Sequence, residues 1–287
     1  MKTQDKLLRI LILIASLLVV LCTVATIVLF SVSRKAPPAD GTDTDTETGE
    51  SGNTQDPSTG PETDTSSLPA SVLLPETADK GLDYQNRLYF FGESTTAHLK
   101  SRGVLTGGKS TKQVFHPNTN TLQIQNACST KLRYLGDSTE EDTIGNIVKK
   151  VKPEYLVLCF GLNGVEKFSS GETGKKLFVT SYQSLIDEIR KNSPDTRIIL
   201  ESIYPVASGC TDFKADAATI NSYLKQINEW TMELARKNGL KFCDAASAVT
   251  GKDGFLDPAY AMSDGVHITA EGYKQVLAYF RTHAYPD

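Results

Sequence analysis

The sequence predicts an α/β fold in which helices cover both faces of a mostly parallel β-sheet. Short apolar runs at 88–91, 155–160, 197–201 and 240–243 alternate along the chain with segments whose apolar residues recur at helical spacing. The run at 155–160 is apolar throughout, which is typical of a strand covered on both faces. Such sheets hold their sites beyond the carboxyl ends of the strands, so polar residues that follow these runs are the first candidates for function.

The helices between the strands are predicted from capping signals and apolar stripes. Ser138-Thr139-Glu140-Glu141 forms a capping box, which predicts a helix that begins there and ends before Pro153. Apolar residues recur at helical spacing over 182–189 and 220–234, and a final helix is expected over about 269–281. These helices would supply the outer layers of the fold.

The segment between residues 104 and 135 is the least regular part of the folded region. It contains Gly107-Gly108 and the sequence His116-Pro117-Asn118-Thr119-Asn120, which we interpret as a hairpin turn. Alternating apolar residues, Leu122 and Ile124, follow this turn.

Charge is distributed unevenly along the 287 residues, whose formal net charge is −4. Residues 1–35 carry five basic residues and one acidic residue, whereas residues 36–67 carry eight acidic residues and no basic residue. The remaining residues are therefore close to neutral and contain no basic run, which argues against a nucleic acid as a partner.

The N-terminal residues predict a membrane anchor and a spacer. Residues 10–32 contain no charged side chain, and a helix of this length spans about 35 Å, enough to cross a bilayer core. Because the segment is longer than the apolar part of a cleaved signal peptide, we expect an uncleaved anchor. Residues 33–70 are rich in Thr, Ser, Gly, Pro and acids, and we expect a disordered stalk.

These observations predict four parts. They are a cytoplasmic end (1–9), a transmembrane signal-anchor helix (10–32), the stalk (33–70) and a folded domain (71–287). Basic residues lie on both sides of the span, with a slight excess before it, and this asymmetry favours a cell-membrane protein with an extracytoplasmic C-terminal domain.

Three loops after predicted strands or before the last helix hold polar residues that chemistry could use. They are Gly92-Glu93-Ser94, Gly161-Leu162-Asn163-Gly164 and Asp264-Gly265-Val266-His267. A serine hydroxyl needs a base to take its proton, and an imidazole base needs a carboxylate to fix its tautomer. Asp264 and His267 are close enough in sequence to meet, and they could activate Ser94.

An oxyanion site is predicted at the same edge of the sheet. Asn163 follows the central strand and could direct its side-chain N–H at a developing negative charge, together with the backbone N–H of Ser94. No Cys or His cluster has the spacing of metal ligands, so neither a metal nor another cofactor is predicted.

The three loops resemble the conserved blocks of the SGNH or GDSL-type hydrolases. Gly92-Glu93-Ser94 looks like the first block, Gly161-Leu162-Asn163 the third, and 264–267 the last. The resemblance implies a flavodoxin-like three-layer α/β/α fold, with Ser94 as nucleophile, His267 as base and Asp264 as its orienting acid. It also implies a third oxyanion donor from a glycine of the second block, for which Gly107 and Gly108 are the candidates.

The sequence departs from this family at two of these positions. Glu93 stands where the family usually has Asp, and Gly164 replaces the usual Asp after the oxyanion Asn. The α/β-hydrolases are a poorer match, because their nucleophile lies in Gly-x-Ser-x-Gly and Thr96 occupies the last of those places here.

Three functions follow as hypotheses. The first is a serine esterase that removes O-acetyl or other acyl groups from cell-surface glycans. The second is an O-acetyltransferase that modifies surface polysaccharide beside a multi-spanning membrane partner, as the resemblance allows. The third is a catalytically inactive binding domain on a stalk.

Other polar residues receive structural interpretations. His98 is expected to be a packed or surface residue, although it lies one helical turn from Ser94, and His116 and His283 are expected to be exposed. Cys159 and Cys243 fall in apolar runs and are expected to be buried thiols. The spacing of the cysteines leaves their disulfide state open.

Overall fold

The computed structural model describes residues 72–119 and 121–286. The predicted cytoplasmic end, transmembrane helix and stalk therefore lie outside the described residues. Within the described ranges, no helix is both long enough and apolar enough to cross a membrane.

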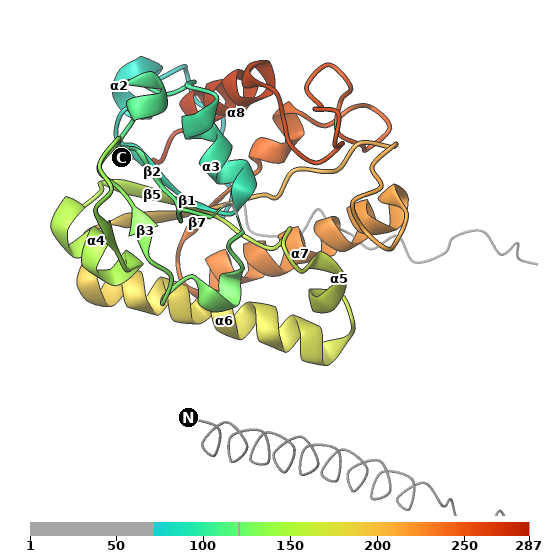
Figure 1. Ribbon diagram of the computed structural model, residues 1–287, viewed down its shortest axis with the longest axis horizontal. Helices are drawn as coiled ribbons and strands as arrows, with labels where there is room; N and C mark the ends of the chain where they lie inside the picture. The colour runs from blue at the N-terminus through green and yellow to red at the C-terminus, as the bar shows by residue number, and fades with distance from the viewer. Residues whose placement is uncertain (1–71, 120, 287) are drawn as a thin grey trace, which may run out of the picture. The chain divides into compact units, whose positions relative to one another are not determined.

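The core of the domain is a five-stranded parallel sheet with the order β2-β1-β5-β6-β7 (Figure 1). The chain builds outward in both directions from β1, so the strand order reverses between β1 and β5. A crevice forms beyond the carboxyl ends of the strands at such a reversal. The strands are β1 (Leu88–Gly92), β2 (Val114–Phe115), β5 (Tyr155–Cys159), β6 (Arg197–Glu201) and β7 (Lys241–Cys243).

Helices cover both faces of this sheet, as the sequence predicts (Figure 1). One face carries α2 (Gly81–Gln85), α3 (Ser94–Ser101) and α8 (Ala270–Thr282). The other carries α4 (Ile144–Val151), α5 (Val165–Phe168), α6 (Glu172–Asn192) and α7 (Ala217–Lys237). Short 3₁₀ helices lie at η2 (Gly108–Ser110), η3 (Ile124–Asn126) and η4 (Ala245–Ala248).

Alternation within the strands divides the core into two layers. Phe90 packs with the α3 and α8 side, whereas its neighbour Phe91 packs with the α4 and α6 side. All five residues of β5 are buried, which confirms the prediction of a central strand covered on both faces. Burial of both layers is the main force that holds β1 and β5, and hence the loops after them, in place.

Helix α7 fixes the loop that follows β6. The Asn228 side chain both accepts from the N–H and donates to the carbonyl of Ile203, and Asn221 makes the same pair of bonds with Val206. Trp230, on the same helix, is buried and packs against Phe178. Two asparagine side chains therefore tie the carboxyl edge of the sheet to α7.

Two local predictions are wrong. The capping box at 138–141 does not begin a helix, because Glu141–Asp142 forms β4 and pairs antiparallel with β3 (Leu132–Arg133); α4 begins only at Ile144. The predicted hairpin after β2 does not form among the described residues. His116 instead forms an antiparallel bridge with Arg133. In both places antiparallel pairing with another segment outweighs the local signal.

The cysteines lie as the apolar runs predict. Cys159 and Cys243 are buried, Cys210 is also buried, and Cys128 is half-buried. All four are free thiols in the described part of the chain.

Candidate active site

Ser94 is the first residue of α3 and follows the last residue of β1 by two positions. The turn requires Gly92, because a Cβ there would collide with the Thr96 side chain and the Cys159 carbonyl. Ser94 therefore stands at the carboxyl edge of the sheet, where the first N–H groups of α3 have no carbonyl partner within the helix. These groups can donate to a negative charge that develops beside the hydroxyl.

The structure brings Ser94, His267 and Asp264 together in one chain of hydrogen bonds. The distance from Ser94 Oγ to His267 Nε2 is 2.9 Å, and the distance from His267 Nδ1 to Asp264 Oδ2 is also 2.9 Å. The side chains of His267 and Asp264 are 23% and 34% exposed, and Ser94 is half-buried, so all three groups are partly accessible to solvent. This arrangement allows a proton to move from the serine hydroxyl to the imidazole.

Asp264 is positioned by its own loop. Its Oδ1 accepts the backbone N–H groups of Val266 and His267, each at 2.8 Å. Partial burial raises the pKa of Asp264, but these two bonds and the bond from the His267 ring outweigh it, and the net pKa lies below the ordinary value. Asp264 is therefore a carboxylate at neutral pH.

The loop after β5 is tied to the Ser94 turn by Glu93. The Glu93 side chain is buried, and its two oxygens accept the N–H of Gly161 at 3.2 Å and the N–H of Asn163 at 2.9 Å. Burial raises the pKa of Glu93 to about 7, although the backbone N–H groups of this loop lower it. The sequence places Glu93 in a recognised block, but its function as a clamp on the β5 loop is visible only in the structure.

The Asn163 side chain faces the segment that follows β2. Its Nδ2 donates one hydrogen bond to the Leu122 carbonyl at 2.8 Å, which fixes the plane of the amide. A side-chain amide carries two N–H groups, so one remains for another acceptor. Gly164 has a φ of 103° and is the N-cap of α5, a left-handed conformation that the usual Asp would rarely adopt.

The structure does not bring Gly107 or Gly108 to Ser94, so their assignment to the oxyanion site is corrected. The adjoining Thr106 donates to Asn86, which precedes β1, whereas Ser94 follows the end of β1. The five residues of β1 span roughly 16 Å, so the two glycines lie at the opposite edge of the sheet. The N–H of Gly108 is also bonded within its own turn, to the Leu105 carbonyl.

His98 is packed, which is one of its two expected placements, whereas His116 and His283 differ from the expectation. The ring of His98 lies against that of His267, with 4.3 Å between centroids and 40° between planes, so it belongs to the site. The spacing of one helical turn between Ser94 and His98 was the sequence signal for this placement of His98 at the site. His116 and His283 are half-buried rather than exposed.

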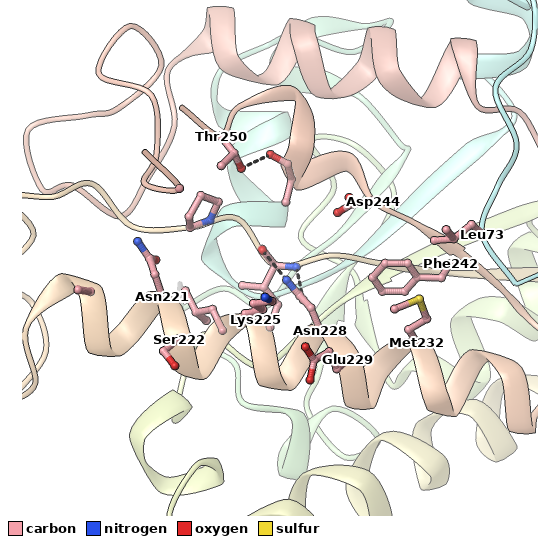
Figure 2. Close-up of a pocket in the computed structure, with 16 residues that line it drawn as sticks. Leu73, Asn221, Ser222, Lys225, Asn228, Glu229, Met232, Phe242, Asp244 and Thr250 are labelled. Atoms are coloured by element: carbon pink, nitrogen blue, oxygen red, sulfur yellow. Dashed lines mark hydrogen bonds between the residues drawn. The ribbon is translucent and has the colours of Figure 1, made fainter. Parts of the chain in front are cut away.

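A large cavity of about 950 Å³ lies away from Ser94, between α7 and the segments that follow β6 and β7 (Figure 2). Lys225, Asn228 and Met232 line its α7 side, and Phe242 and Thr250 face them.

In the part of the chain that the structure describes, no group of three or more His, Cys, Asp or Glu side chains could hold a metal ion.

Residues 90–275 match the GDSL-like lipase/acylhydrolase family, a range that includes Ser94, Asn163 and His267. The chain belongs to this family. It is therefore an SGNH-type hydrolase of the esterase class. No curated protein matches the chain.

Solved structures of lipases and an esterase are similar to the chain at low identity. A GDSL-like lipase of Bacteroides thetaiotaomicron is 18% identical, with a TM-score of 0.46, and the match covers 69% of this chain and 87% of the lipase. An extracellular lipase of Streptomyces rimosus is 13% identical, with a TM-score of 0.44 and coverage of 69% and 99%. An acetylxylan esterase of Geobacillus stearothermophilus is 16% identical, with a TM-score of 0.40 and coverage of 69% and 94%.

Proposed function

We propose that this SGNH hydrolase is a serine esterase in which Ser94, His267 and Asp264 form the catalytic triad. The observation that carries the proposal is the continuous hydrogen-bond chain from Ser94 Oγ through both nitrogens of His267 to Asp264. Family membership supports an enzyme and removes the support for an inactive binding domain.

The reaction follows from this geometry. Ser94 Oγ attacks the ester carbonyl carbon while His267 Nε2 takes the hydroxyl proton, and Asp264 stabilises the imidazolium. The bond to the alcohol oxygen then breaks, and the alcohol leaves with the proton from His267. Water attacks the acyl group on Ser94 in the same way, and the carboxylic acid is released as Ser94 regains its proton.

The oxyanion that forms in each step would be bound by two donors. One is the backbone N–H of Ser94 at the start of α3, and the other is the Asn163 N–H that is not bonded to Leu122. Donors fixed before the reaction stabilise the transition state without reorganisation. Glu93 contributes by holding the Asn163 loop beside the Ser94 turn.

We further propose that the substrate is an acylated glycan at the cell surface, with O-acetyl as the acyl group. The uncharged segment at 10–32 supports a single-pass anchor in the cell membrane, and the acidic segment after it supports a spacer. As a flexible coil, the acidic residues 36–67 would reach roughly 30–35 Å on average, so the domain would act close to the membrane. The alternative is an O-acetyltransferase, in which the acyl group on Ser94 passes to a sugar hydroxyl instead of to water.

Labelling and product analysis of the full-length protein test this proposal. A fluorophosphonate probe should label the wild type at Ser94 and should not label Ser94→Ala. Incubation with acetylated cell-wall and capsular glycans should release acetate, and an added sugar acceptor should stay unmodified. Folded protein that resists labelling would overturn the triad, and acetylation of the acceptor instead of acetate release would favour the transferase.

A further inference from the structure

Helix α3 and the residue after it place three polar side chains one above another. Ser94, His98 and Arg102 are spaced four residues apart, so they share one face. The ring of His98 lies 4.3 Å from that of His267. The Arg102 guanidinium donates to the Met262 thioether, and the Met262 N–H donates to the His267 carbonyl at 2.9 Å. This face therefore contacts the segment around His267 at two points.

His98 is held in its neutral form. Its Nδ1 is buried without a hydrogen-bond partner among the described residues, so a proton there would be an unsatisfied donor. Burial, and then the charges of His267 and Arg102, lower the pKa of His98 to about 4, while Asp264 raises it. His98 is therefore uncharged at the pH at which an imidazole base works.

Two hydrogen bonds hold the His267 ring before the reaction, one to Ser94 and one to Asp264. When Ser94 carries an acyl group, its oxygen is esterified and can no longer donate to His267. The bond to Asp264 then holds only one end of the ring. The contact between the His98 and His267 rings does not involve Ser94 Oγ, so it persists in the acylated state. A neutral ring tolerates an adjacent imidazolium, whereas a second cation would repel it.

We propose that His98 is a positioning residue for deacylation, whose neutral ring supports the face of His267 while Ser94 is acylated. In this step water attacks the acyl carbonyl and His267 Nε2 takes the water proton. The bond from the acyl carbon to Ser94 Oγ breaks, Oγ receives that proton, and the carboxylic acid leaves. His98 itself exchanges no proton. This inference rests on the triad proposed above.

The test is His98→Ala in the full-length protein, with p-nitrophenyl acetate as substrate. Slower deacylation should lower kcat by about tenfold and lower KM in parallel, because the acyl-enzyme accumulates. The ratio kcat/KM reports acylation and should stay within about threefold of the wild type. The burst of nitrophenolate should rise toward one per active site. Ser101→Ala, an exposed change on the same helix, is the control and should leave all three values unchanged.

Two further variants separate support by a ring from general packing. His98→Phe keeps a flat neutral ring, and its kcat should stay within about threefold of the wild type. His98→Leu fills a similar volume without a ring, and it should show the kcat and KM of His98→Ala. Melting temperatures show whether each variant folds. If His98→Ala does not fold, the comparison of His98→Phe with His98→Leu tests the proposal.

Specific outcomes overturn the proposal. An unchanged burst and kcat in His98→Ala, or an equal loss in kcat and kcat/KM, would remove His98 from deacylation. A folded His98→Phe as slow as His98→Ala would show that a nitrogen, and not the ring, is required. A wild type that fails to react at Ser94 would instead contradict the proposed function, so the two failures are distinguishable.

Discussion

Asp264 and Glu93 perform similar tasks in different surroundings. Each carboxylate accepts two backbone N–H groups of a loop that carries a functional side chain: His267 in one case and Asn163 in the other. The Asp264 side chain is 34% exposed, whereas Glu93 is 2% exposed. Asp264 accepts both N–H groups with Oδ1, which leaves Oδ2 for the His267 ring, whereas Glu93 uses one oxygen for each N–H, and the burial also differs.

Burial decides the electrostatic result. The pKa of Asp264 lies below its ordinary value, whereas burial raises the pKa of Glu93 to about 7. Asp264 therefore carries a charge that can stabilise an imidazolium, and Glu93 is close to its titration point at neutral pH. The comparison indicates that one carboxylate acts through its charge and the other through its geometry.

The largest expected effect comes from removing the Asp264 charge. In Asp264→Asn, the side-chain N–H₂ would face His267 Nδ1 and favour the tautomer that cannot accept the Ser94 proton. We expect kcat/KM for a small acetyl ester to fall by roughly 10⁴-fold with little change in melting temperature. Steady-state kinetics and a melting curve check this. A loss below tenfold in a folded variant would show that Asp264 does not act through its charge.

A smaller effect is expected from Glu93→Gln. One end of the new amide would place an N–H₂ against a backbone N–H of the Asn163 loop, so that loop should shift. We expect kcat to fall by about 10- to 100-fold with little change in KM, because the oxyanion donor is misplaced.

Asn163→Ala should lower kcat by about 10²- to 10³-fold.

The double variant shows whether Glu93 acts through Asn163. Once Asn163→Ala has removed the donor, adding Glu93→Gln should cost less than about threefold. Melting temperatures of all three variants separate loop displacement from unfolding. Losses that multiply in the double variant would mean that the two residues act independently, and a near-normal kcat in a destabilised Asn163→Ala would make Asn163 a turn residue only.

The sequence was sufficient for features that depend on local patterns. The apolar runs identified four of the five parallel strands but not the two-residue β2, and β5 is buried along its length as its composition predicts. Asp264 and His267 could be paired because they lie three residues apart on one loop. Ser94 could be placed beside them because carboxyl ends of parallel strands share one edge.

Features that depend on strand pairing or on packing between segments could not be predicted. The capping box at 138–141 was misinterpreted because Glu141 pairs with Arg133 in a small sheet. Gly107 was misplaced because nothing in a Gly-Gly pair shows at which end of a strand it lies. The buried state of Glu93 and the contact between His98 and His267 arise from packing, which spacing alone does not show.

The smallest effect concerns stability and extends the comparison to a second buried carboxyl. Glu201 is also buried, accepts a 2.6 Å bond from the Tyr204 hydroxyl, and has its pKa raised by burial to about 7. Glu93 and Glu201 both have folded-state pKa values above the ordinary 4.5, so the folded protein binds these protons more tightly than the unfolded chain. Stabilisation present at low pH is therefore lost as pH rises through about 7.

We expect the folded domain to be more stable at pH 6.5 than at pH 8, on the order of 1–2 kcal/mol. His98 opposes this trend only below about pH 6.5, because its pKa is lowered to about 4. Glu201→Gln keeps an acceptor for Tyr204 and removes one titration, so it should reduce the difference by about half and raise the melting temperature at pH 8 by a few degrees. Denaturant unfolding at the two pH values measures both effects. A wild type that is more stable at pH 8 would show that these carboxyls are ionised in the folded state, and the contrast between Glu93 and Asp264 would then be one of exposure alone.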